Sequence, residues 1–317
     1  MSTRPSPMPD TPLDDRITAA GPATRPLYWS VRRELWENRS IYIAPLIAAT
    51  LVPLGLLISR FCPVNPGSAA SAADPAKQTA ALSTPSLFAV TPSLFAVSLL
   101  FLTAFIVGVF YCLDALHGER SDRSILFWKS LPVSDLTTVL SKASIPLAVL
   151  PALTFVLILA TQLVVLLMRS IALLADGLSA ATVWTPVPLF NMTLALLYGL
   201  TVMALWHAPI YGWLLLVSGW ARRATFLWAV LPPVAIVVVE KIAFNTSYVG
   251  SLLHYRLSGA VARAYAATSS SGSPFDPLAT QLTPGRFLAT PGLWLGLGCA
   301  GLFLFAAARL RRQGRPI

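Results

Sequence analysis

Residues 93–113 read SLFAVSLLFLTAFIVGVFYCL, a run without a single charged side chain. A helix needs about 20 such residues to cross the hydrocarbon core of a bilayer. Backbone N–H and C=O groups must also be bonded within the protein there, which a helix achieves on its own. This stretch therefore predicts a membrane-spanning helix, and it sets the fold class of the chain around it.

Five more stretches meet the same requirement of length and apolarity. The six predicted spans cover residues 41–61, 93–113, 144–168, 189–218, 226–244 and 291–308. We therefore expect an all-α fold, a polytopic membrane protein with six transmembrane helices. Small residues recur every four positions on the last span, at Gly292, Gly296 and Ala300, and this spacing lets other helices approach closely.

The composition of the whole chain also favours a membrane protein. Of its 317 residues, 56% are hydrophobic and 11% are charged, whereas soluble domains carry about 25% charged residues. The net charge is +10, but the bases lie beside the ends of the apolar stretches, which is typical of membrane orientation. We therefore expect lipid around the chain and no nucleic-acid partner.

The positions of Lys and Arg predict how the chain crosses the membrane. If both termini lie on one side, 16 of the 23 bases fall on that side, in the terminal segments, the 114–142 loop and the turn after the fourth span. Cytosolic segments carry the excess of bases. We expect a multi-pass protein of the bacterial inner membrane with both termini in the cytosol. Residues 1–26 are expected to be a disordered cytosolic tail, and residues 27–317 the membrane domain.

A short amphipathic helix is predicted before the first span. Tyr28, Trp29 and Trp36 fall on one half of a helical wheel with Leu27, Val31 and Leu35, and Arg33, Glu34 and Glu37 fall on the other. Such a helix suits the membrane interface, with its aromatic side chains at headgroup depth. A simple anchor and a grip on a partner protein both explain it.

The longest external segment is expected at residues 245–290. Its first half spaces apolar residues as a helix lying along or dipping into the outer leaflet would, and its second half is rich in turn residues. Glu240 stands just before it, beside Lys241, and is either functional or an interfacial side chain that reaches water. His207, inside the fourth span, either faces a cavity or bonds a neighbouring helix.

The loop between the second and third spans carries HGERSDRSILFWKSLPVSD at residues 117–135. Gly118 is expected to break the preceding helix, Ser121 to cap a short new one, and Pro132 to end it. Phe127 and Trp128 would form its aromatic face. A second cap is expected at Ser134, with Asp135 in the first turn of the next helix. The loop either lies on lipid or binds a protein, and its acidic residues favour protein.

No motif of an enzyme or a metal site is present in the sequence. It lacks GxxxxGK[ST], HExxH and GxSxG, and its three cysteines are widely spaced. We expect no enzymatic activity and no cofactor on this chain. Its energy would have to come from a partner or an ion gradient.

Residues 119–142 resemble the cytosolic loop of ABC-2-type transporter permeases. The residues that carry the likeness are Glu119, Arg120, Leu126, Ser130, Pro132, Val133, Ser134 and Lys142, while RSIL stands where the family shows a G-T-L-like opening. The N-terminal helix, the hydropathy plan and the external helix are also similar to that family.

The resemblance implies a mechanism and a set of site residues. Such permeases pair as homodimers or heterodimers and dock two cytosolic ABC ATPase subunits, which hold the ATP and Mg²⁺. The implied docking residues are Glu119, Arg120, Arg123, Phe127, Trp128, Leu131, Pro132, Ser134 and Asp135. The second and fifth spans of the family line the path. This places Thr103, Pro232 and Pro233 near the substrate, and Glu240 is a further candidate there.

Three functions are compatible with the sequence. The first is the membrane subunit of an ABC exporter with an unidentified substrate. The second is a non-transporting scaffold or sensor that recruits a cytosolic partner through the same loop. The third is a gradient-driven carrier, which ranks last because the chain shows no inverted repeat.

Overall fold

The computed structural model describes residues 26–61, 85–122, 134–175, 177, 179, 189–267 and 280–313. Within these ranges the chain is helical except for one short hairpin, in which β1 (Tyr265–Ala267) pairs antiparallel with β2 (Thr280–Leu282). The helices are α1 (Pro26–Glu37), α2 (Ser40–Phe61), α5 (Pro85–Ala115), α6 (His117–Ser121), α8 (Asp135–Ser144), η2 (Ile145–Val149), α9 (Leu150–Ala175), α11 (Leu189–Trp220), α12 (Thr225–Phe244), α13 (Tyr248–Ala264), α14 (Pro284–Leu288) and α15 (Pro291–Gln313).

Six helical segments in the described ranges are long and apolar enough to cross a membrane. They are Ser40–Ile58, Phe95–Ser121, Asp135–Ala175, Phe190–Trp220, Thr225–Phe244 and Pro291–Arg312. The prediction of six spans is confirmed, as expected for a multi-pass membrane protein. The third segment is continuous through α8, the π-helix η2 and α9, so the helix begins well before the predicted apolar stretch.

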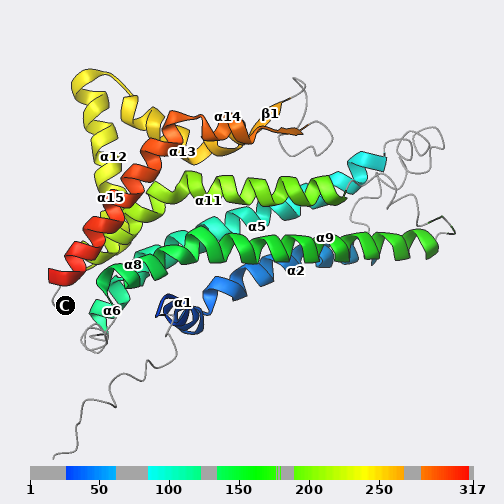
Figure 1. Ribbon diagram of the computed structural model, residues 1–317. Helices are drawn as coiled ribbons and strands as arrows, with labels where there is room; N and C mark the ends of the chain where they lie inside the picture. The colour runs from blue at the N-terminus through cyan, green and yellow to red at the C-terminus, as the bar shows by residue number, and fades with distance from the viewer. Residues whose placement is uncertain are drawn as a thin grey trace, which may run out of the picture.

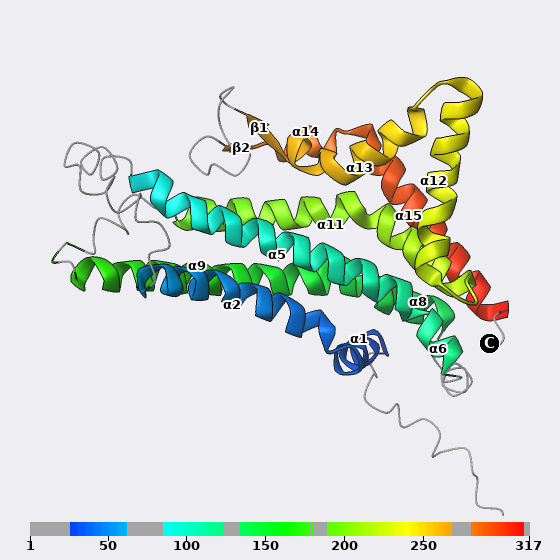
Figure 2. The same cartoon turned by 180° about the vertical axis from the view of Figure 1, so that it is seen from behind.

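Four long helices, α2, α5, α9 and α11, run side by side (Figures 1 and 2). α15 packs along α11, and α13 and α14 lie beyond the end at which α15 begins. α12 stands away from this bundle: 6% of its spanning window is buried, against 56% for α11. α11 is therefore the central helix, and α12 offers most of its apolar surface to the surroundings.

The predicted cap at Ser134 is confirmed. Its hydroxyl accepts a hydrogen bond from the backbone N–H of Thr137 at 3.1 Å, and α8 begins at the next residue. The break after the second span falls at Leu116, earlier than the predicted Gly118. Its physical reason is Ser218 of α11, whose hydroxyl accepts from the backbone N–H groups of Leu116 and His117 at 3.0 and 2.9 Å.

Ser121 is the last residue of α6. The helix predicted to start there falls on residues 123–133, outside the described residues.

α1 is a helix, as predicted, and it packs on the bundle through polar and apolar side chains together, since Val31 and Leu35 also lie against the main hydrophobic core. Glu34 is 1% exposed, whereas Trp29 and Trp36 are 57% and 69% exposed. Arg32 lies between these two rings, with its guanidinium carbon 5.4 and 4.8 Å from their centroids. α1 is therefore attached to the bundle through Glu34 and through the two aliphatic side chains, and its aromatic side chains face outward.

Candidate functional site

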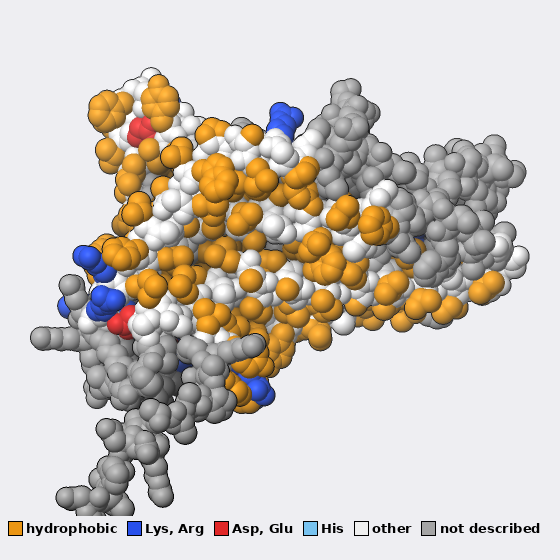
Figure 3. Space-filling model, viewed as in Figure 1, with side chains coloured by type: hydrophobic (Ala, Val, Ile, Leu, Met, Phe, Trp, Pro, Cys, Tyr) orange, Lys and Arg blue, Asp and Glu red, His pale blue; other side chains and the backbone are white. Residues whose placement is uncertain are grey.

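Charged side chains gather on the surface at the end of the molecule where the C-terminal end of α15 lies (Figure 3). Six charged side chains, four of them buried, join α1, α6, α8 and α15, and we call them the ionic cluster: Arg33, Glu34, Glu119, Asp135, Lys142 and Arg311. Three are cations and three are acids, so their charges balance. They come from α1, α6, α8 and α15.

Lys142 of α8 lies at the centre of the cluster. Its Nζ is 2.8 Å from Oε1 of Glu34 and 3.1 Å from Oε1 of Glu119, and its side chain is 3% exposed. Arg33 reaches the same two carboxylates through Nη2, at 2.9 and 3.2 Å. One lysine and one arginine therefore join α1 to both α6 and α8.

Arg311 extends the cluster to the last helix. Its Nη1 donates to Oε2 of Glu119 at 2.5 Å, and its Nε donates to Oδ1 of Asp135 at 3.1 Å. The side chain is 5% exposed. The C-terminal end of α15 is thus bonded to α6 and to the first residue of α8.

Buried charges are tolerated only when they are paired and hydrogen-bonded, because desolvation of each ion costs several kcal/mol. Glu34 meets this condition: Tyr111 of α5 donates its hydroxyl to Oε2 at 2.9 Å, and Lys142 donates to Oε1. Burial alone would raise the pKa of Glu34, but Lys142, Arg33 and Tyr111 outweigh it, and the pKa lies below the ordinary 4.5. Glu34 is therefore a carboxylate at neutral pH.

Members of the ionic cluster flank the segment from 123 to 133 in the chain. Glu119 comes just before this segment, and Asp135 and Lys142 come just after it. A displacement of either end therefore acts directly on the bonds to α1 and α15. The arrangement joins four helices through ion pairs.

Four of the predicted docking residues are described, and each has a partner within the chain. Glu119 and Asp135 belong to the ionic cluster, and Ser134 caps α8. Arg120 donates through Nη1 to the backbone oxygen of Gly219 at 2.7 Å, at the C-terminal end of α11, where helix carbonyls lack helical partners. These side chains hold the ends of the loop in place.

The remaining predicted docking residues lie outside the described residues. They are Arg123, Phe127, Trp128, Leu131 and Pro132. Their role in binding a partner stays a prediction.

The role of the predicted path residues stays a prediction, and the structure shows the local setting of each. Thr103 donates its hydroxyl to the carbonyl of Leu99 at 2.8 Å, within its own helix. Pro232 and Pro233 lie on α12, the helix that stands apart from the bundle.

Glu240 has a clear structural role at the start of α13. Its carboxylate accepts from the backbone N–H groups of Tyr248 and Val249 at 2.5 and 2.8 Å, and from the hydroxyl of Thr246 at 3.0 Å. A negative charge is favourable at a helix N-terminus, where N–H groups are unpaired. Glu240 thus fixes the turn between α12 and α13.

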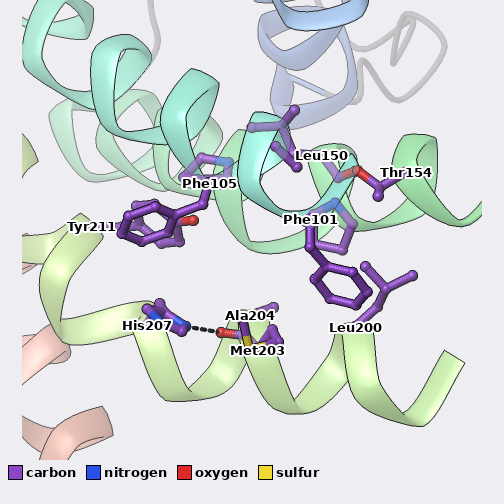
Figure 4. Close-up of a pocket in the computed structure, with 12 residues that line it drawn as sticks. Phe101, Phe105, Leu150, Thr154, Leu200, Met203, Ala204, His207 and Tyr211 are labelled. Carbon is purple, nitrogen blue, oxygen red and sulfur yellow. Dashed lines mark hydrogen bonds between the residues drawn. The ribbon is translucent and has the colours of Figure 1, made fainter. Parts of the chain in front are cut away.

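One apolar pocket lies between α5, the η2–α9 segment and α11 (Figure 4). It leaves about 40 Å³ for the centres of water molecules, and Phe105, Thr154 and Tyr211 are among its lining residues. His207 also lines it and is 3% exposed, with Nδ1 2.8 Å from the carbonyl oxygen of Met203 on its own helix. None of the predicted path residues lines this pocket.

Sequence reasoning missed the internal partners of the loop, which are Glu34, Tyr111 and Arg311. Charged residues beside a span are usually solvated, so the sequence alone gives no reason to bury Glu34 and Arg311. The sequence signal that could have indicated these partners is Lys142, because a base at the start of a span needs an acid nearby. No group of three or more His, Cys, Asp or Glu side chains that could hold a metal occurs in the described part of the chain.

Known proteins give no further guide to this site. No protein-family model matches the chain, no curated protein matches it, and no solved structure matches its fold. The resemblance to ABC-2-type permeases therefore stays a prediction based on the loop residues.

Proposed function

We propose that this chain is the membrane-spanning permease subunit of an ABC exporter. A separate cytosolic ATPase subunit would bind and hydrolyse the ATP, so the chain itself would be no enzyme and hold no cofactor. The transported substrate is not specified by the proposal. Both termini would lie in the cytosol, and the membrane would be the bacterial inner membrane.

The observation that carries the proposal is the position of the ionic cluster. Both ends of the 123–133 segment join one buried set of ion pairs, and the same set holds α1 and the end of α15. A protein that pushes on this segment would therefore move several helices together. Packed interfaces respond to such a push by switching between discrete arrangements.

Two further features support a permease that pairs with a like subunit. α12 is apolar and has little contact with the rest of the described chain, so a second permease subunit and lipid are its natural neighbours. The outward aromatic half of α1 suits the membrane interface, with Trp29 and Trp36 at headgroup depth. We propose a homodimer or a close heterodimer.

Partner capture and ATP turnover test the proposal. The tagged, full-length protein is extracted from membranes of its native host, and co-purifying proteins and ATP hydrolysis are measured. The variant Arg123→Glu with Trp128→Ala should lose a co-purifying ATPase. The matched control is Arg223→Glu, which makes the same charge change at an exposed position between α11 and α12.

A second variant tests the mechanical role of the cluster. Arg311→Met removes the link from α15 to α6 and α8 and should leave the ATPase bound but lower its turnover in membranes. Arg312→Met, at the exposed neighbouring position, serves as control. Absence of any ATPase from the wild-type preparation, with no response to either loop substitution, would contradict the exporter and leave the scaffold or sensor.

A further inference from the structure

Arg256 of α13 is a cation inserted between α11 and α15, far along the chain from the ionic cluster. Its guanidinium carbon lies 4.7 Å from the centroid of the Trp206 ring. Nη1 donates to the backbone oxygen of Trp206 at 3.3 Å, and Nη2 donates to the backbone oxygen of Gly292. Trp206 is fully buried, so its ring forms a fixed platform for the guanidinium.

The small residues of α15 create the space that Arg256 occupies. A Cβ at Gly296 would collide with the guanidinium, and a Cβ at Gly292 would come within 2.9 Å of the Tyr255 hydroxyl. At Gly292 and Gly296 the space that the small residues leave is filled by side chains of α13 and not by the backbone of another helix. The seat of Arg256 is therefore shaped by three separate helices.

The charge of Arg256 is not neutralised within the described residues. Its hydrogen bonds there go to backbone carbonyls, and no Asp or Glu side chain pairs with it. The sequence from 245 to 290 contains three arginines and one acid, Asp276. Arg256 is partly buried, and burial lowers the pKa of its guanidinium. A desolvated cation without a counter-charge is costly unless an anion approaches it.

The surroundings of Arg256 select the kind of anion. Gly292 lies in the first turn of α15, at the start of the Pro291–Arg312 segment that can cross a membrane. A span that begins there would place the guanidinium near headgroup depth. The neighbouring outward side chains are apolar: Trp294 and Leu295 on α15 are 61% and 71% exposed, and Leu257 on α13 is 55% exposed. A charged group with a hydrocarbon tail fits this combination, whereas a free ion would leave the apolar surface uncovered.

We propose that Arg256 binds the phosphate group of a lipid-like amphiphile whose hydrocarbon tail lies against the apolar side chains of α13 and α15. The guanidinium N–H groups that are not bonded to carbonyls would donate to the phosphate oxygens, a geometry for which arginine is well suited. This site goes beyond the proposed transport function and stands without an ATPase partner.

Lipid titration of the full-length protein in detergent tests the site, with bound ligands counted by native mass spectrometry. The probes are dioleoyl phosphatidylglycerol, dioleoylglycerol with the same tails but no phosphate, and inorganic phosphate. We expect the phospholipid to bind about tenfold or more tightly than dioleoylglycerol. Inorganic phosphate at millimolar concentration should not compete, and competition by it would refute a ligand with a tail.

Four variants locate the effect. Arg256→Gln should lower phosphatidylglycerol affinity by about tenfold, and Arg256→Lys, which keeps the charge, should lose only a few-fold. Arg286→Gln removes an exposed arginine of α14 and should change affinity by less than about twofold. Asp276→Asn should also change little.

Two further results overturn the proposal. The first is wild-type protein that binds the two lipids equally, which decides the question even if Arg256→Gln does not fold. The second is a gain of phospholipid affinity of about tenfold in Asp276→Asn, because that residue would then be the counter-charge of Arg256.

Discussion

Lys142 is a buried cation and Arg256 a partly buried one, and the two have different partners. Lys142 lies between two carboxylates, in a cluster with as many acids as bases. Arg256 lies on a tryptophan ring and bonds carbonyl oxygens, without an acid among the described residues. A matched cluster is complete on its own and suits a structural connection, whereas an unmatched cation suits a site for an external anion.

The largest expected effect is the loss of unfolding free energy when Lys142 is removed from the ionic cluster. In Lys142→Ala, Glu34 and Glu119 would face each other without the ammonium that both contact. Loss of one partner from a buried ion pair costs about 3–5 kcal/mol of unfolding free energy. Thermal or denaturant unfolding in detergent measures it.

Glu37→Ala is the matched control for that experiment. Glu37 is 52% exposed and lies 3.4 Å from Arg33, so its loss should cost less than about 1 kcal/mol. Equal destabilisation by the two substitutions would show that the buried cluster contributes no more than a surface pair.

Gly296→Ala should destabilise the surroundings of Arg256, with a smaller loss of unfolding free energy than Lys142→Ala. The new methyl group would collide with the Arg256 guanidinium, and overpacking of this kind costs about 1–3 kcal/mol. Gly298→Ala and Gly301→Ala are controls on the same helix, since nothing lies within 4 Å of a Cβ at either position. Each control should be neutral or stabilising by up to about 1 kcal/mol. If all three variants behave alike, α15 does not hold Arg256 as described.

The smallest expected effect is the pH dependence of the unfolding free energy, which should involve the ionic cluster and not Arg256. The pKa of Glu34 is lower in the folded protein than its ordinary value of 4.5. Such a group stabilises the fold at pH values above its unfolded pKa, and this contribution is lost as the pH falls through the folded pKa. Unfolding free energy should therefore hold from pH 7 to about 4.5 and then fall.

The variant Glu34→Gln tests whether Glu34 causes the loss of unfolding free energy at acidic pH. It should show a shallower fall below pH 4.5 than the wild-type protein, measured by unfolding at each pH, because its side chain does not titrate. Arg256 keeps its charge throughout this range, so Arg256→Lys should follow the wild-type curve. A Glu34→Gln curve parallel to wild type would contradict the depressed pKa.

Features of the fold that depend only on residues close in sequence were predictable. A run such as 93–113 is apolar whatever surrounds it, so the six spans follow from length and hydropathy. The cap at Ser134 was also predictable, because its bond to Thr137 spans only three residues. The break at Leu116 was misplaced because its cause, Ser218, lies on another helix.

The faces of the helices were harder to assign. The helical wheel of α1 grouped Val31 and Leu35 with Trp29 and Trp36, but in the structure the first two pack on the core and the last two are exposed. In a membrane protein the apolar half can face lipid, so Glu34 can point inward and Trp36 outward. Hydrophobic pattern alone does not distinguish these two orientations.

The sequence by itself determined the class of this protein, its six spans and the local start of α8, because these depend on hydropathy and on hydrogen bonds between near neighbours. Only the tertiary structure decided which charges meet. Glu34 and Lys142 are 108 residues apart in the chain, and Glu119 and Arg311 are 192 apart. Pairing over such distances depends on how the helices pack, and so does the seat of Arg256 against Trp206 and Gly296.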